Sequence, residues 1–210
     1  MPSYLNETSG ATGGSPASID YVSTQAPLLA AMGSPPAGSA LGSHAVQTLA
    51  PAQVQAALTM TSGAASIAAI RLAAGQTLST AGFVSYTTAA VTPTHWWLCL
   101  LDNTYTCRAT TADQLTGAIA ASTWFNIAFA ASYTATYTGL YYLGVMVAAS
   151  TMPTLCGATA PLAAMVTAAT APTPLLGGVS TTGLTTAPTA GTTALVAPTA
   201  AAVTPYLFAY

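Results

Sequence analysis

The chain has 210 residues, of which only 3% carry a charge, and it contains no lysine. An ordinary globular domain is about 25% charged. Two arginines are too few to neutralise the phosphates of a nucleic-acid partner or to attach the protein to an anionic lipid surface. The mean hydropathy is +0.57, yet the most apolar run, residues 140–150, is only about half as long as a membrane-spanning helix. We therefore expect neither nucleic acid nor a membrane as a partner.

Residues 1–62 are rich in Gly, Ser, Pro and Ala, and runs such as Gly33-Ser34-Pro35-Pro36 are typical of loops. We expect an extended N-terminal arm that packs on a neighbouring molecule. Within this arm, apolar residues recur at spacings of three to five between Val46 and Leu58. That spacing predicts a short helix within residues 45–58, with Pro51 in its first turn.

From residue 63 onward, aromatic and β-branched residues are dense, and turn signals recur about every ten residues. This spacing is typical of an antiparallel β-sandwich or jelly roll. The predicted strands are 66–72, 77–87, 95–101, 105–110, 123–130 and 139–148. Residues 111–122 could form a short helix or a loop. We therefore predict an all-β fold, with a sandwich domain over residues 63–210.

The predicted strand 139–148 is apolar on both faces. Because side chains alternate along a strand, they fall into two sets. One set is Leu140, Tyr142 and Met146, and the other is Tyr141, Leu143, Val145 and Val147. A sheet with one exposed face alternates apolar with polar residues. Both faces of this strand should therefore be buried, inside the fold or at a subunit contact.

Residues 161–210 are rich in Thr, Ala and Pro, a composition that disfavours helix. We expect long loops and short edge strands in this part of the chain. A last strand is predicted over residues 204–210, with its aromatic side chains packed into the fold.

The sequence offers no set of residues for catalysis. Asp102 and Asp113 are the carboxylates of residues 63–160. A position in a turn explains Asp102, and a position near the start of a possible helix explains Asp113, as well as acid–base chemistry does. Neither His44 nor His95 accompanies a Gly-x-Ser-x-Gly motif. The two histidines and three cysteines lack the spacing of a metal site, and no phosphate-binding loop is present. We predict a non-enzymatic protein with no catalytic, cofactor-binding or metal-binding residues.

Arg71 and Arg108 each stand alone in an apolar predicted strand. An unpaired buried charge is costly, so each should contact a carboxylate or backbone carbonyls. For Arg108 we expect an ion pair with Asp102 or Asp113.

A three-residue loop at 102–104 would place Cys99 opposite Cys107 in a hairpin, where a cross-strand disulfide is geometrically feasible. A reducing cytosol instead favours two buried free thiols, and we prefer that interpretation. Cys156 is expected to be buried and inert.

Trp96, Trp97, Tyr105 and Trp124 are candidates for an aromatic contact surface, which could bind sugar rings or another subunit. Adjacent tryptophans on a strand point to opposite faces. Packing in the core and at subunit contacts is therefore the favoured interpretation.

The stretch from Val91 to Asp102, with His95-Trp96-Trp97 at its centre, resembles small virion proteins encoded by phages of actinobacteria. Residues 138–148, the following Met152-Pro153-Thr154-Leu155 and residues 180–188 are similar to the same proteins. The resemblance covers residues 65–210. It implies a β-sandwich on a tail or capsid surface and assigns no site residues.

A surface with so few charges is poorly protected against self-association, so we expect it to be covered by partners. The leading hypothesis is a bacteriophage structural protein that decorates or stabilises the capsid, assembled in the host cytoplasm and released by lysis. Its partners would be copies of itself, with a trimer expected, and major capsid or tail proteins. The alternative is a minor tail protein or a receptor-binding, carbohydrate-binding tail protein. A hydrolase of cell-wall sugars is disfavoured by the shortage of carboxylates.

Overall fold

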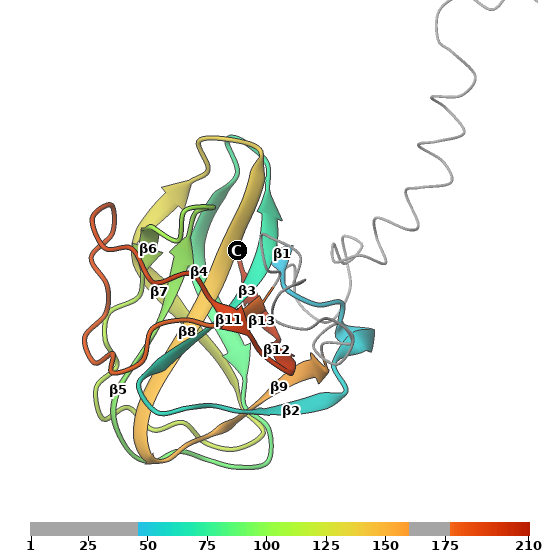
Figure 1. The fold of residues 1–210 in the computed structure, drawn as a ribbon, viewed down its shortest axis with the longest axis vertical. Helices are drawn as coiled ribbons and strands as arrows, with labels where there is room; N and C mark the ends of the chain where they lie inside the picture. The colour runs from blue at the N-terminus through green and yellow to red at the C-terminus, as the bar shows by residue number, and fades with distance from the viewer. Residues whose placement is uncertain (1–45, 160–176) are drawn as a thin grey trace, which may run out of the picture.

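The fold is built from antiparallel strands, and a computed structural model describes it for residues 46–159 and 177–210 (Figure 1). The strands are β1 (Val46–Gln47), β2 (Ala56–Thr59), β3 (Ala64–Leu72), β4 (Thr77–Val84), β5 (Val91–Leu101), β6 (Cys107–Thr110), β7 (Trp124–Thr134), β8 (Gly139–Thr151), β9 (Thr154–Thr159), β10 (Gly177–Val179), β11 (Thr199–Ala200), β12 (Val203–Pro205) and β13 (Leu207–Ala209). One short 3-10 helix, η1 (Pro51–Gln53), lies between β1 and β2. None of the described segments is a helix long and apolar enough to cross a bilayer.

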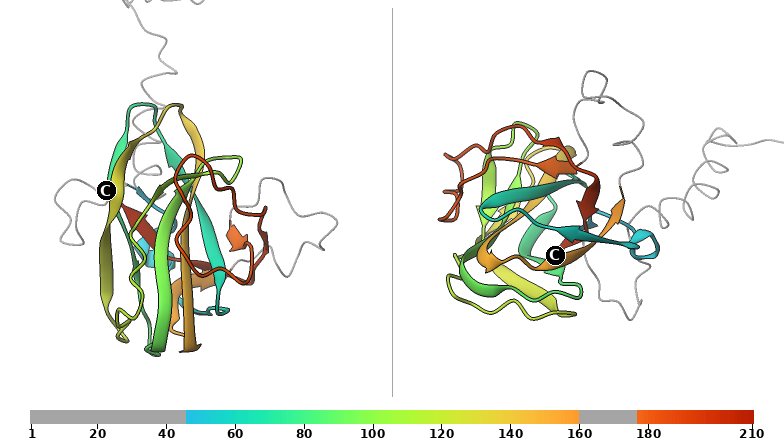
Figure 2. Two further views of the ribbon diagram at one scale, coloured as in Figure 1. Left: turned by 90° about the vertical axis from the view of Figure 1, so that its left-hand side faces the viewer. Right: turned by 60° about the horizontal axis from the view of Figure 1, so that its bottom comes forward.

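The strands form three sheets. A six-stranded sheet has the order β11-β10-β3-β8-β5-β6, and a four-stranded sheet has the order β1-β13-β4-β7. These two are the main layers of the sandwich, and their long strands run from end to end of the molecule in Figure 2. A smaller sheet, β12-β9-β2, adds to the core near one end. The fold is thus the predicted all-β antiparallel sandwich.

The inner core lies between the sheets and is filled by large apolar side chains from both layers. Phe83 of β4, Leu98 of β5 and Leu207 of β13 are all fully buried in it. β8 contributes four residues on this side, which are Tyr141, Leu143, Val145 and Val147. These four residues are the set that was predicted, from the alternation of side chains along the strand, to share one face.

A second, outer core covers the opposite face of the six-stranded sheet. Tyr142 and Met146 of β8 are fully buried here. They pack with Trp97 of β5 and with Leu195, which belongs to residues 180–198, here called the covering segment. In Figure 1 this segment is the orange-red chain that runs along the outside of β5 and β6. The two-faced burial predicted for β8 therefore occurs within one chain.

Backbone and indole hydrogen bonds hold the covering segment in place. Ser180 N donates to Ala65 O at 2.8 Å, and Trp97 Nε1 donates to Thr185 O at 3.1 Å. At the other end of the segment, Leu195 N donates to Tyr105 O at 3.0 Å. The Thr- and Pro-rich segment thus forms a layer of loop that covers one face of the six-stranded sheet.

The predicted last strand is divided at Tyr206. Residues 203–205 pair with β9 as β12, whereas residues 207–209 lie between β1 and β4 as β13. β13 is therefore an interior strand of its sheet. Its Phe208 ring crosses Gly82, where an added Cβ would lie 2.4 Å from Phe208 Cζ and 2.2 Å from Phe125 O. Only glycine fits at this position.

Two predictions about the N-terminal part are wrong within the described residues. Residues 46–59 form β1, η1 and β2 in place of the predicted helix, although Pro51 does open the 3-10 turn. β1 pairs with β13, and β2 pairs with β9, so residues 46–62 belong to the sandwich and not to an arm. Residues 1–45 lie outside the described residues. Residues 111–122, for which a helix or a loop was predicted, contain no helix.

Candidate functional site

The four aromatic residues proposed as one surface are dispersed. Trp96 packs in the inner core and Trp97 in the outer core, because neighbouring side chains of β5 point to opposite faces. Tyr105 is half-buried and packs against Tyr142, with ring centroids 5.0 Å apart. Trp124 lies on the other sheet and is 50% exposed. No single aromatic platform results.

Trp124 borders an apolar groove formed by two adjoining pockets. The first has a volume of about 170 Å³ and is lined by Pro51, Val54, Val84, Trp124, Cys156 and Tyr206. The second has a volume of about 140 Å³ and is lined by Val54, Gln55, Ala56, Ala57, Tyr86 and Cys156. Val54 and Cys156 are common to both. Trp124 lines the first pocket, and Tyr86, which is 47% exposed, lines the second.

All three cysteines are free thiols. The predicted opposition of Cys99 and Cys107 is wrong, because β5 and β6 pair Cys99 with Thr110 and Leu101 with Cys107. A bulge between Leu100 and Leu101 shifts the register. Burial raises the pKa of Cys99, and it raises the pKa of Cys107 to about 12, so both thiols stay protonated near neutral pH.

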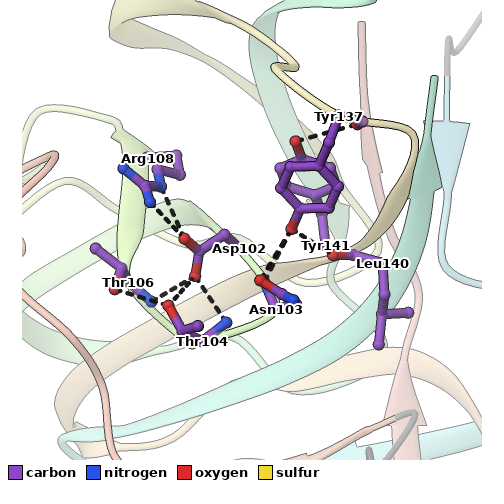
Figure 3. Close-up of polar contacts among 8 residues, drawn as sticks. All are labelled: Asp102, Asn103, Thr104, Thr106, Arg108, Tyr137, Leu140 and Tyr141. Atoms are coloured by element: carbon purple, nitrogen blue, oxygen red, sulfur yellow. Dashed lines mark hydrogen bonds and ion pairs between the residues drawn. The ribbon is translucent and has the colours of Figure 1, made fainter. Parts of the chain in front are cut away.

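A polar turn joins β5 to β6 and centres on Asp102 (Figure 3). Of the two partners considered for Arg108, the structure places Asp102 in contact. Arg108 Nε and Nη2 both donate to Asp102 Oδ2, at 2.9 and 2.6 Å. Asp102 Oδ1 accepts hydrogen bonds from Thr104 N at 2.8 Å, Thr104 Oγ1 at 2.7 Å and Thr106 N at 3.0 Å. The buried carboxylate is therefore fully satisfied.

These contacts set the protonation state of the turn. Burial by itself raises the pKa of Asp102, but hydrogen bonds from Thr104, Arg108 and Thr106 outweigh it and hold the pKa below its usual value. The same contact with Asp102 raises the pKa of Arg108. At physiological pH the carboxylate and the guanidinium are thus both ionised, and the pair carries no net charge.

Tyr137 lies beside the polar turn, in the loop between β7 and β8. Its ring stacks on Tyr141 with centroids 4.6 Å apart and planes 17° apart. Tyr137 Oη donates to Leu140 O at 3.0 Å and accepts from Asn103 N at 3.2 Å. Figure 3 shows Arg108 and Tyr137 on either side of Asp102, at the end of the sandwich. Sequence reasoning did not identify Tyr137 or Asn103, which the chain brings together from positions 34 residues apart.

Asp113 binds a histidine, and the sequence did not predict this pair. His95 Nδ1 lies 2.6 Å from Asp113 Oδ2. Asp113 Oδ1 also accepts hydrogen bonds from Trp96 N at 3.2 Å and Leu115 N at 3.0 Å. The contacts fasten the 111–117 loop along β5, and none of them brings a serine or cysteine to the histidine. The pair therefore has a structural explanation.

Arg71 differs from Arg108. Its side chain is exposed on β3, and within the described residues it makes no ion pair. Among the described residues, the prediction that it contacts a carboxylate or carbonyls is wrong, because a guanidinium on an exposed strand face needs no protein partner.

The described residues contain no group of three or more His, Cys, Asp or Glu side chains that could hold a metal ion. A comparison with protein-family models gives no match for the chain. No curated protein matches it. The function must therefore be argued from the chain's own geometry.

Proposed function

We propose that this protein is a non-enzymatic structural component of a bacteriophage particle that decorates or stabilises the capsid surface. The observation that carries the proposal is the lack of charge on the described surface. Of the charged side chains there, Asp102 and Arg108 neutralise each other, and Asp113 binds His95. Arg71 alone is left uncommitted among residues 46–159 and 177–210. A surface with so few charges favours association, so we expect other molecules to cover much of it.

The apolar groove supports the same proposal. It joins an apolar pocket to a second pocket whose lining is mixed polar and apolar, and half-exposed aromatic rings border it at Trp124 and Tyr86. Aromatic side chains are enriched in protein contacts because they bury a large area at a small entropic cost. The partners that fit this chemistry are further copies of this chain, in a trimer, and the major capsid protein. The virion is then its location, after assembly in the host cytoplasm and release by lysis.

A minor tail protein or receptor-binding tail protein is the alternative. The aromatic platform first considered for that role would need Trp96, Trp97, Tyr105 and Trp124 on one face. Because Trp96 and Trp97 are buried in different cores, that platform does not form. The alternative must therefore depend on another part of the surface.

Immunogold electron microscopy of intact particles, with antibody raised against this chain, tests the proposal. Label distributed over the head is the expected result. Label confined to the tail would replace capsid decoration with the tail assignment. Particles from which the chain is absent by mass spectrometry would overturn the virion proposal as a whole.

A further inference from the structure

The guanidinium of Arg108 is held rigidly while most of its donors stay available. An arginine has five N–H groups. Two of them bind Asp102 Oδ2, which leaves three without a partner among the described residues. The side chain is 39% exposed, so these donors reach the surface. Because the buried Asp102 fixes the group, little side-chain entropy is lost when a ligand accepts hydrogen bonds from it.

A half-buried aromatic ring stands on the other side of the same turn. One face of Tyr137 stacks on the buried Tyr141, and because the residue is only half-buried, part of the ring reaches the surface. Gly139 keeps the ring in this position, because a Cβ there would lie 2.7 Å from Tyr137 Cε2. The phenol is also held by Asn103 N and Leu140 O. The ring is therefore a preformed flat surface and not a mobile side chain.

Asn103 adds a polar group between these two. Its side chain is exposed, and its Oδ1 lies 3.2 Å from Tyr137 Oη, whose single hydrogen is shared between this oxygen and Leu140 O. That contact leaves the amide NH2 as a donor with no partner among the described residues. This end of the sandwich thus combines a flat ring with N–H donors on exposed side chains, and Figure 3 shows the residues side by side.

We propose that Arg108, Asn103 and Tyr137 form a binding site for a neutral carbohydrate at this end of the sandwich. Sugar hydroxyls accept hydrogen bonds from the guanidinium and amide donors, while the C–H face of a pyranose packs on the tyrosine ring. The Asp102–Arg108 pair is neutral as a unit, so it provides no long-range attraction for a polyanion. This site is separate from the aromatic residues considered from the sequence, and it does not depend on whether the protein occupies the head or the tail.

The test uses the full-length protein and four immobilised neutral polysaccharides, dextran, mannan, galactan and arabinan, with polygalacturonate as the anionic comparison. Binding is measured by biolayer interferometry for the wild type and for Asn103→Ala, Arg108→Lys and Arg71→Lys. Arg71→Lys is the matched control, because it makes the same change in the other exposed arginine. The melting temperature of each variant is measured first.

We expect the wild type to bind at least one neutral polymer. Asn103→Ala and Arg108→Lys should each weaken this binding tenfold or more, while Arg71→Lys should leave it within twofold. If Arg108→Lys does not fold, Asn103→Ala decides, because its exposed side chain contributes little to stability. Binding to none of the neutral polymers, binding to polygalacturonate alone, or an equal loss in the Arg71 control would each overturn the site.

Discussion

Asp102 shows how a protein with few charges uses one of them. Five hydrogen bonds from three residues converge on its carboxylate. They fix the turn between β5 and β6 and orient Arg108. Replacing Asp102 with alanine would leave backbone N–H groups of Thr104 and Thr106 unsatisfied and the guanidinium unpaired. We expect Asp102→Ala to lower the free energy of unfolding by about 2 to 4 kcal/mol, measured by urea denaturation. If Asp102→Ala lowered the free energy of unfolding less than Asn103→Ala does, the central role of the Asp102 carboxylate would be contradicted.

The depressed pKa of Asp102 also predicts a dependence on pH. The folded state binds this proton less tightly than the unfolded state, whose carboxyl has a pKa near 3.8. The stabilisation is therefore complete above about pH 4 and is lost as the pH falls through the lower pKa of the folded protein. The melting-temperature difference between wild type and Asp102→Asn should narrow from pH 4 to pH 2. A difference that stays constant over this range would show that the carboxylate is not responsible.

The three thiols should differ in reactivity. Cys99 and Cys107 are buried and Cys156 is only half-buried, lining both pockets of the apolar groove. Burial raises the pKa of all three. Because Cys156 is the most accessible of the three, iodoacetamide at pH 8 should modify it first and should reach the other two only on unfolding. Peptide mass spectrometry measures the order of labelling. Early labelling of Cys99 would show that the covering segment opens in the native protein.

Among the elements, the covering segment supplies apolar side chains to the outer core. Its Leu195 is 6% exposed in the outer core, whereas the adjacent Val196 is 64% exposed. Leu195→Ala should cost about 2 to 4 kcal/mol and speed proteolysis of the segment, because it leaves a cavity against Trp97. Val196→Ala is the matched control and should cost less than about 0.5 kcal/mol. Equal effects in chemical denaturation would mean that the segment does not seal this face.

The same elements show what the sequence could predict. The two faces of β8 were assigned correctly because each residue's side follows from alternation alone. The helix expected over 45–58 was wrong because β1 and β2 are ordered by pairing with β13 and β9, more than 90 residues away. A local pattern carries no information on such partners. The sequence left Arg108 with two candidate partners because Asp102 and Asp113 lie about equally close to it along the chain. It missed the contact of Tyr137 with Asn103 because the two residues are 34 positions apart.

At the scale of the whole molecule, the proposed assembly predicts a change in oligomeric state. Tyr86 borders the apolar groove, and a charge there would be costly to bury at an interface. Tyr86→Lys should weaken self-association at least tenfold in sedimentation-velocity experiments. Val196→Lys introduces the same charge on the covering segment and should change association much less. A wild-type protein that is monomeric at all concentrations would exclude a homo-oligomer.

The position of β13 has a consequence for biosynthesis. This strand pairs with β1 on one side and with β4 on the other. Without it, no described strand joins β1 to the rest of the four-stranded sheet. The four-stranded sheet therefore cannot close on a nascent chain until residues 207–209 have left the ribosomal tunnel. Until then the apolar faces of β4, β7 and β8 are exposed to other nascent copies. Closure of this sheet should therefore await residues 207–209, and chaperones are expected to hold the earlier strands during that interval.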